Sequence, residues 1–400
     1  MSKKSFVKKL MPFVTLMADL ISLFFRLIPK NRKLVIFGSM AGNYYGDNSR
    51  YVFERILQTN PELQSVWMTR KKSIYNELIK MNLPVCYMYS VSGLTSIIRA
   101  SLGVYTNNLA DIALFPTLAP SNMKLLALRH GRSVKKVRYA ANTNRLSFSE
   151  RFMIKKETKM IHGAISTSEF ISEVQELVLR IGADKHFITG YPRNDALYND
   201  IKDHFLKTLR DQYNNIILYG PTWRHGDNPV KFFPFSNVSI ADLNEILKSK
   251  NSLLLLRPHK NELKHKEVRS QLEECESHSN IKTITHEDLP SVNDLLPLCN
   301  GLICDYSALY HDFLLLDRPL IMVPYDFELL EKKGGFLYDY YDRSPGPIVS
   351  DYSQFFDEIL NILNGDDTYK LQRRSLCNLI HKYNDNHSTD RVIKLLLKFL

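Results

Sequence analysis

Residues 301–326 read GLICDYSALYHDFLLLDRPLIMVPYD, and this stretch is the most informative part of the chain about its architecture. It contains two short apolar runs, Gly301–Cys304 and Pro319–Val323, and between them a segment of helical period that starts at Ser307. Continuous apolar runs of this length, joined by a helix, are typical of parallel strands that are covered on both faces. The stretch therefore predicts a strand–helix–strand unit of an α/β domain.

The same alternation extends over most of the chain. In the N-terminal half we expect strands at Leu34–Gly38, Ser65–Met68, Val85–Met88, Leu102–Thr106, Lys124–Leu128 and Ala164–Thr167, and helices that include Ser49–Gln58 and Ser168–Arg180. In the C-terminal half we expect further strands at Asn215–Tyr219, Ser252–Leu256 and Ile281–Ile284, and helices near Ser239–Lys248, Ser291–Leu298 and Ser307–Leu316. Residues 190–195, GYPRND, interrupt the pattern with Gly and Pro. We predict two doubly wound, Rossmann-like domains, residues 33–195 and 196–400, which face each other across a cleft, with a largely helical C-terminal part at Tyr352–Leu400.

Length and charge limit the function classes. A chain of 400 residues suits two domains, and its net charge of +11 favours acidic partners such as anionic lipid, a phosphate-rich substrate or nucleic acid. The basic residues are dispersed and match no nucleic-acid-binding motif, which argues against the last of these. None of the five cysteines forms a CxxC pair, so we expect a reducing compartment.

Residues 1–32 begin basic, turn apolar and end basic. Pro12 and Asp19 interrupt the apolar part, which is short for a bilayer core of ~30 Å, and no small-x-small cleavage site follows it. We expect an amphipathic segment that holds the protein peripherally on the cytoplasmic face of the membrane, with a helix packed on the protein's own surface as the alternative. The basic residues expected to face anionic headgroups are Lys3, Lys4, Lys8, Lys9, Arg26, Lys30, Arg32 and Lys33.

Several polar side chains directly follow predicted strands. His130 lies between an apolar run and Gly131, where a ring with an ordinary pKa of ~6.5 can take a proton from an alcohol, unless it is a structural histidine. Thr222 and Arg224 follow one strand of the second series, and Arg257 and His259 follow the next. A guanidinium suits phosphate oxygens, so these residues are candidates for a phosphate clamp. We expect Trp223 to pack in the core rather than to stack on a base.

Three further positions leave alternatives open. Ser307 begins a helix whose free N–H groups suit an anion, and Asp305 either orients that turn, contacts a ribose or caps the helix. Asp47 and its neighbour Asn48 either contact the acceptor or cap the helix that follows the first strand. Arg193 either contacts phosphate or forms part of a hinge.

The order of these motifs resembles a known family. GNYYGDNSRYVFERI, HGRSVKK, GYPRND, YGPTWR, LRPH and the opening stretch, followed by GGFLYDY and PGP, are similar to the CDP-glycerol glycerophosphotransferases of teichoic-acid and capsule synthesis, which have a GT-B architecture. The resemblance implies an essential His130, places His259 at the donor pyrophosphate or leaving group, and puts Asp326 near the nucleotide or a cation. Two positions depart from the family pattern, Arg132 in place of a small hydroxyl residue and Ala308 in place of a second serine.

The resemblance implies a reaction. Glycerol phosphate would pass from CDP-glycerol to a hydroxyl of a lipid-linked or polymeric acceptor, with His130 as base and CMP as leaving group. Walker, GxGxxG, HExxH, GxSxG and DxD motifs are missing, which favours a site without a cofactor or metal, with a loosely held Mg²⁺ as the alternative. A CDP-ribitol transferase, a GT-B glycosyltransferase and a non-catalytic scaffold stay open, and the length favours a primase or short-chain transferase.

Overall fold

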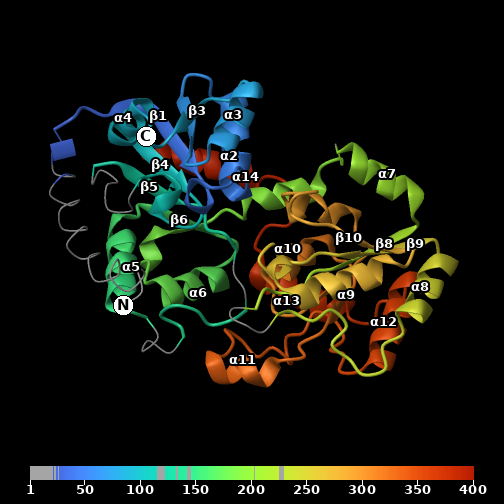
Figure 1. Ribbon diagram of the computed structural model, residues 1–400. Helices are drawn as coiled ribbons and strands as arrows, with labels where there is room; N and C mark the ends of the chain where they lie inside the picture. The colour runs from blue at the N-terminus through green and yellow to red at the C-terminus, as the bar shows by residue number, and fades with distance from the viewer. Residues whose placement is uncertain are drawn as a thin grey trace. The chain divides into compact units, whose positions relative to one another are not determined.

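The computed structural model describes residues 21, 24–25, 27–114, 122–131, 134–141, 146–201, 203–224 and 229–400. The chain forms two compact units, each built on its own sheet (Figure 1). The first unit comprises the chain through Gly131, Val137–Asp195 and Asp385–Leu400, and the second comprises Arg132–Lys136 and Ala196–Asn384.

The first unit contains a seven-stranded sheet in the order β3-β2-β1-β4-β5-β6-β7, and every pair is parallel. The strands are β1 Asn31–Gly38, β2 Gln64–Thr69, β3 Val85–Tyr87, β4 Ala100–Tyr105, β5 Lys124–Ala127, β6 Gly163–Ser166 and β7 His186–Ile188. The helices are α2 Asp47–Thr59, α3 Lys72–Lys80, α4 Val91–Arg99, α5 Phe148–Met160, α6 Glu169–Leu179 and α14 Ser388–Phe399. The strand order reverses between β1 and β4, the position at which doubly wound sheets bind ligands beyond their carboxyl ends.

The second unit repeats this plan with five parallel strands in the order β10-β9-β8-β11-β12. The strands are β8 Asn215–Tyr219, β9 Ser252–Leu256, β10 Ile281–Thr283, β11 Gly301–Cys304 and β12 Leu320–Met322. The helices are α7 His204–Gln212, α8 Ile240–Ser249, α9 Lys266–Glu276, α10 Ala308–Phe313, α11 Phe327–Lys333, α12 Tyr352–Asn364 and α13 Lys370–Ile380. The order reverses between β8 and β11, so Thr222 and Asp305 follow the two strands at the switch point.

The apolar runs behave as predicted. Val35, Phe37, Val104 and Leu126 are buried in the core of the first unit, and every residue of β9 is buried in the second. Burial of continuous apolar strands on both faces is what a helix-covered parallel sheet requires. The predicted fold class, two parallel α/β sheets, is confirmed.

Two predicted elements differ from the structure. Residues Ser291–Leu298 form two 3₁₀ turns, Val292–Asp294 and Leu296–Leu298, instead of one helix. Pro297 explains the difference, because proline lacks the N–H that an α-helical ladder needs. The strand β7 was not predicted, because its three half-buried residues are too few to show a pattern.

The last helix, α14, corrects the expectation that residues 196–400 form one domain. It lies beside α2 in the first unit (Figure 1), where Val392 and Leu396 enter the same core cluster as Phe53. The carboxylate of Asp195 accepts hydrogen bonds from the backbone N–H groups of Ser388 and Thr389 at 3.0 and 2.7 Å, which anchors the start of this helix.

Residues 1–20, 22, 23 and 26 lie outside the described part of the chain, and most of the predicted membrane segment falls among them. Lys30 lies among the described residues, and the expectation that it faces lipid headgroups is wrong. Its ammonium group donates to the carbonyl oxygen of Ile98 at 2.5 Å, and burial lowers its pKa to about 8, so it faces the protein rather than headgroups. Among the described residues, no helix combines the length and the apolar character needed to cross a bilayer.

Candidate active site

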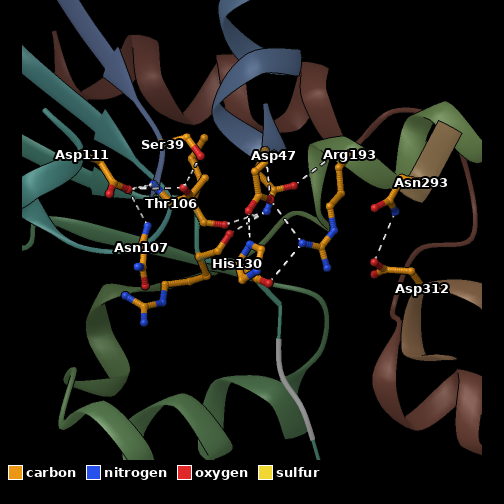
Figure 2. A network of polar contacts seen from close by, with 12 residues as sticks. Ser39, Asp47, Thr106, Asn107, Asp111, His130, Arg193, Asn293 and Asp312 are labelled. Carbon is orange, nitrogen blue, oxygen red and sulfur yellow. Dashed lines mark hydrogen bonds and ion pairs between the residues drawn. The ribbon is translucent and has the colours of Figure 1, made fainter. Parts of the chain in front are cut away.

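His130 and Asp47 meet at the carboxyl edge of the first sheet (Figure 2). Asp47 opens α2, and its Oδ2 hydrogen bonds to Nδ1 of His130. Its other oxygen accepts from Nη1 of Arg193 at 3.2 Å, and the same nitrogen reaches the carbonyl oxygen of His130 at 3.1 Å. The side chain of Asp47 is 4% exposed whereas that of His130 is 56% exposed, so a buried carboxylate holds an accessible imidazole.

This pairing defines the ionisation of Asp47. Burial by itself would raise the pKa of Asp47, but the charge and hydrogen bond of His130, together with the charge of Arg193, lower it well below its ordinary value. An ionised carboxylate can only accept, so the proton at this contact sits on Nδ1 of His130. In the neutral ring, Nε2 is then the nitrogen that can take a proton. Gly46 is the residue that caps α2, so the alternative of a helix cap at Asp47 is wrong, and the alternative of an acceptor contact stays a prediction.

Asn48, for which the sequence left an acceptor contact or a helix cap open, fixes the backbone around His130. Its Nδ2 donates to the carbonyl oxygens of Leu128 and Arg129 at 3.1 and 2.7 Å, and its Oδ1 accepts from the N–H of Arg193 at 3.0 Å. Gly131 has φ of +82°, and a Cβ there would lie 2.5 Å from Nη2 of Arg193. Arg193 is thus a structural partner of the histidine turn, and a glycine is required beside it.

In the second unit, Arg224 joins the ends of three strands. Its guanidinium forms two hydrogen bonds with Asp326, at 2.8 and 2.9 Å, and an ion pair with Asp305 at 2.7 Å. Thr222 donates its N–H and its hydroxyl to Asp305 at 2.9 and 2.5 Å. Thr222 and Arg224 follow β8, Asp305 follows β11 and Asp326 follows β12, so one charge network ties the carboxyl edge of this sheet together.

The network corrects the expectation that Arg224 grips phosphate directly. Arg224 is 6% exposed, and two carboxylates neutralise its charge. Its backbone N–H donates to the fully buried Glu262 at 2.8 Å, which fixes the loop after β8 as well. Both aspartates form ion pairs with this guanidinium, and Asp305 also accepts the N–H groups of Thr222 and Tyr306, which corresponds to the turn-orienting role that the sequence left open for it.

Arg257 and His259 follow β9 and have different partners. The guanidinium of Arg257 donates to the carbonyl oxygens of Ile284, Thr285 and Leu289, and so holds the loop after β10. Nδ1 of the exposed His259 accepts the N–H of Asn261 at 3.2 Å, which leaves the proton of the neutral ring on Nε2. The ring stacks on Trp223 with a centroid distance of 5.2 Å and an interplanar angle of 10°. The prediction that Trp223 packs in the core is therefore wrong.

Two further groups complete the described site of the second unit. Ser307 caps α10, because its Oγ accepts the N–H of Leu309 at 3.2 Å. Lys135, which the sequence reasoning did not select although it lies in HGRSVKK, is held by a short backbone pairing. The N–H of Lys136 donates to the carbonyl oxygen of Gly335 at 2.9 Å, and that of Leu337 donates to the carbonyl oxygen of Val134 at 2.8 Å. The departure Arg132, just before this pairing, lies outside the described residues.

Lys135 brings positive charge to the network around Arg224. Burial lowers its pKa, whereas the charges of Asp305 and Asp326 act to raise it and that of Arg224 to lower it further. These electrostatic couplings place its ammonium group close to the ends of β11 and β12. With Arg224, this cation offsets the charges of the two carboxylates, so the strand ends do not repel the phosphates of a ligand.

Within the described part of the chain, no group of three or more His, Cys, Asp or Glu side chains is arranged to hold a metal ion. A cavity of about 300 Å³ in the second unit, lined by Pro319, Glu358 and Arg373 among others, lies at the amino end of β12. Asp326 follows the opposite end of that strand, so the cavity is not part of this site.

Comparison with known proteins identifies the family. The model of the CDP-glycerol:poly(glycerophosphate) glycerophosphotransferase family matches residues 20–398. The chain belongs to this family. The resemblance inferred from the motifs is confirmed, and so is the classification as a phosphotransferase enzyme of teichoic-acid synthesis.

Relatives of this glycerophosphotransferase differ in length. The present chain is 25% identical to the teichoic acid glycerol-phosphate transferase of Staphylococcus aureus (strain NCTC 8325 / PS 47), over 94% of this chain and 96% of the other. It is 27% identical to the teichoic acid poly(glycerol phosphate) polymerase of Bacillus subtilis (strain 168), over 86% of this chain but only 45% of the polymerase. The wall teichoic acid polymerase TagF has the same fold, with a TM-score of 0.75 at 20% identity over 100% of this chain and 98% of that one. The predicted GT-B-like fold is thereby confirmed.

Proposed function

We propose that this glycerophosphotransferase moves glycerol phosphate from CDP-glycerol to a hydroxyl group of a teichoic-acid-like acceptor and releases CMP. The hydrogen bond between the buried carboxylate of Asp47 and Nδ1 of His130 carries this proposal. It holds an accessible imidazole in the tautomer that a general base needs. The family to which the chain belongs supports CDP-glycerol as the donor.

His130 activates the acceptor. Its Nε2 takes the proton of the attacking hydroxyl as that oxygen bonds to the phosphorus next to glycerol. The bond from this phosphorus to the bridging oxygen breaks at the same centre, and CMP leaves with the electron pair. The imidazolium that forms is stabilised by Asp47, which stays ionised because its pKa is lowered.

His259 and Lys135 serve the donor. Nε2–H of His259 donates to the pyrophosphate and so offsets the charge that develops on CMP. Lys135 adds the second positive charge that, with Arg224, offsets the two carboxylates Asp305 and Asp326, so the strand ends do not repel the donor phosphates. Thr222, Arg224, Arg257, Asp305, Ser307 and Asp326 act as positioning residues that fix the strand ends and loops around the donor. The reaction needs no cofactor in this scheme.

The test is CMP release from CDP-glycerol with a defined acceptor. Replacing His130 or His259 by Ala lowers the rate by about 10²–10⁴-fold each, the usual worth of an acid–base or charge-stabilising group. His204→Ala is the matched control, because His204 is exposed at the start of α7. Full transfer activity in the His130→Ala, His259→Ala double variant would falsify the assignment. Parallel titrations with CDP-ribitol and a UDP-sugar test the alternative donors, and the product masses distinguish one added unit from a polymer.

The acceptor and the membrane belong to the same proposal. The basic residues of the first 33 positions other than Lys30 attract anionic lipid headgroups and hold the enzyme peripherally on the cytoplasmic face, where a lipid-linked acceptor is found. Removing residues 1–20 should lower sedimentation with vesicles that contain anionic lipid while transfer to a soluble acceptor persists. Equal sedimentation of both forms contradicts this role.

A further inference from the structure

The helix α4 turns large apolar side chains toward solvent. Val91 is 84% exposed, Leu94 is 39% exposed and Ile98 is half-buried. Positions i, i+3 and i+7 lie on one face of an α-helix, so these three side chains form one outward stripe. A helix that covers a sheet normally turns such residues toward the sheet. In α4 the buried side carries Gly93 and Ile97 instead.

Gly93 allows this orientation. The helix packs on β1 and β3 (Figure 1), and a Cβ on Gly93 would lie 2.3 Å from the carbonyl oxygen of Tyr87 in β3. The helix therefore approaches the strand without a side chain between them, and its apolar stripe is left outside the core of the first unit. Contiguous exposed apolar residues of this kind are typical of a contact surface.

The segment before β1 adds apolar side chains at one end of the stripe. Lys30 joins this segment to α4, because its Nζ donates to the carbonyl oxygen of Ile98 at 2.5 Å. Leu27 and Phe24, three and six residues earlier, are 81% and 71% exposed. Three residues reach at most ~11 Å, which keeps Leu27 in the neighbourhood of the last turn of α4.

Four cations surround the same end of α4, at the amino edge of the first sheet. They are Arg32 and Lys33 at the start of β1, Arg99 at the end of α4 and Lys124 at the start of β5. Because β1, β4 and β5 are neighbouring parallel strands, their amino ends lie at one edge and span only ~10 Å. All four side chains are exposed, and within the described ranges none forms an ion pair with a carboxylate.

The two stretches of chain that build most of this surface contain no acidic residue. Neither residues 20–46 nor residues 78–110 include an Asp or a Glu. An anionic partner therefore meets positive charge there without repulsion from the same segments. Exposed apolar side chains beside unpaired cations match the boundary between the headgroups and the acyl chains of an anionic membrane.

We propose that the first unit contacts an anionic lipid bilayer through the α4 stripe and the four cations at the amino edge of its sheet. The inference rests on the proposed function, in which basic N-terminal residues hold the enzyme at the membrane, and it adds a folded surface to that contact. Val91, Leu94 and Leu27 enter the headgroup level, and Arg99 and Lys124 pair with lipid phosphates. A surface on the folded unit fixes which side of the enzyme faces the bilayer, which a terminal segment alone does not.

Sedimentation of the full chain with vesicles tests the cations. The vesicles contain phosphatidylglycerol and phosphatidylcholine in equal parts. The double variant Arg99→Gln, Lys124→Gln should lower the partition coefficient by about 25-fold, since each cation near an anionic membrane contributes about fivefold. The matched control is Lys207→Gln, Lys248→Gln, which has the same net charge and changes exposed residues of α7 and α8 in the second unit. Equal losses in the two double variants would reduce the effect to net charge and overturn the surface.

A second pair of variants tests whether the partner is a bilayer. Val91→Ser, Leu94→Ser should lower the partition coefficient by at least about tenfold, because the stripe loses apolar area that the membrane buries. Phe205→Ser, Leu371→Ser is the control, since both residues are exposed on the second unit. If the charge variant loses binding while the stripe variant binds like the wild type, the cations serve a soluble polyanion, and the bilayer proposal is wrong.

Amide hydrogen exchange locates the contact independently. On vesicles the amides of residues 91–99 should exchange more slowly, while those of α8 keep their rates. If the wild type sediments but this exchange and both variants are unchanged, the α4 surface is wrong and the N-terminal attachment stands. If the wild type does not sediment with the vesicles, both membrane contacts are wrong. CMP release from CDP-glycerol with a soluble acceptor still tests the transfer reaction in either case.

Discussion

Replacing Asp47 by Asn tests whether the buried carboxylate positions the base. The amide can still contact His130, but it neither fixes the proton on Nδ1 nor stabilises the imidazolium that forms during transfer. We expect kcat to fall by about 10²–10⁴-fold, which is about 2.7–5.5 kcal/mol at 1.36 kcal/mol for each factor of ten. The acid limb of the pH–rate profile should also move to lower pH, because the protonated base loses its anionic partner.

The same substitution affects stability. Asp47 pairs with Arg193, whose side chain is 8% exposed, and breaking a buried pair from one side costs about 3–5 kcal/mol. The loss of the contact with His130 costs less stability, because His130 is exposed and solvent screens its charge. The pKa of Asp47 is lowered on folding, so its stabilisation is present above the unfolded value of about 3.9 and is lost only as the pH falls through the folded value. Between about pH 6 and 8 the carboxylate itself stays ionised, but the protonated form of His130 loses its anionic partner in Asp47→Asn, so the stability difference from wild type should be larger at pH 6 than at pH 8.

The assay is CMP release with saturating CDP-glycerol and acceptor, at a temperature where both proteins are folded. Asp390→Asn is the matched control, since Asp390 makes an exposed ion pair with Arg55 at 3.1 Å and should change kcat and Tm little. If Asp47→Asn keeps a kcat within threefold of that control, or loses rate with an unmoved pH profile, the carboxylate does not position the base.

Three further predictions concern other parts of the chain. Arg224→Met leaves two carboxylates without their guanidinium and should lower the free energy of unfolding by about 3–5 kcal/mol in denaturant titrations. The control Arg210→Met, at an exposed ion pair, should change this free energy by less than about 1 kcal/mol. Equal effects of the two substitutions would contradict the central role of Arg224. Trp223→Leu removes the stacking partner of His259 and should lower kcat severalfold with a small change in Tm; an unchanged kcat would show that the stacking is dispensable. Lys30 has a pKa lowered to about 8, so the folded state binds fewer protons than the unfolded state above that pH, and stability rises toward the unfolded pKa of about 10.4. Lys30→Met should lack this rise in stability. The same pH dependence of stability in both proteins would refute the lowered pKa of Lys30.

The layout of the two sheets could be predicted from local patterns. Runs such as SLLLL at β9 and GLIC at β11 are apolar throughout because a helix-covered parallel strand has no solvent face, and their bounds in the structure equal the predicted ones. The positions of Thr222, Asp305 and Asp326 at strand ends followed from the same runs. The prediction that the two domains face each other across a cleft stays a prediction.

The partners of the charged side chains could not be predicted in this way. A guanidinium after a strand suits phosphate, yet Arg224 is neutralised by carboxylates that lie 81 and 102 residues further along the chain. Asp47 and His130 are 83 residues apart, and the return of α14 to the first unit depends on a core that other segments build. Periodicity and propensity report how a segment meets its immediate surroundings, so the elements and the fold class could be predicted from local patterns, and the family from its motifs. The pairing of charged side chains depends on the packing of distant segments, so the contact of His130 with Asp47 and that of Arg224 with Asp305 and Asp326 are visible only in the folded chain.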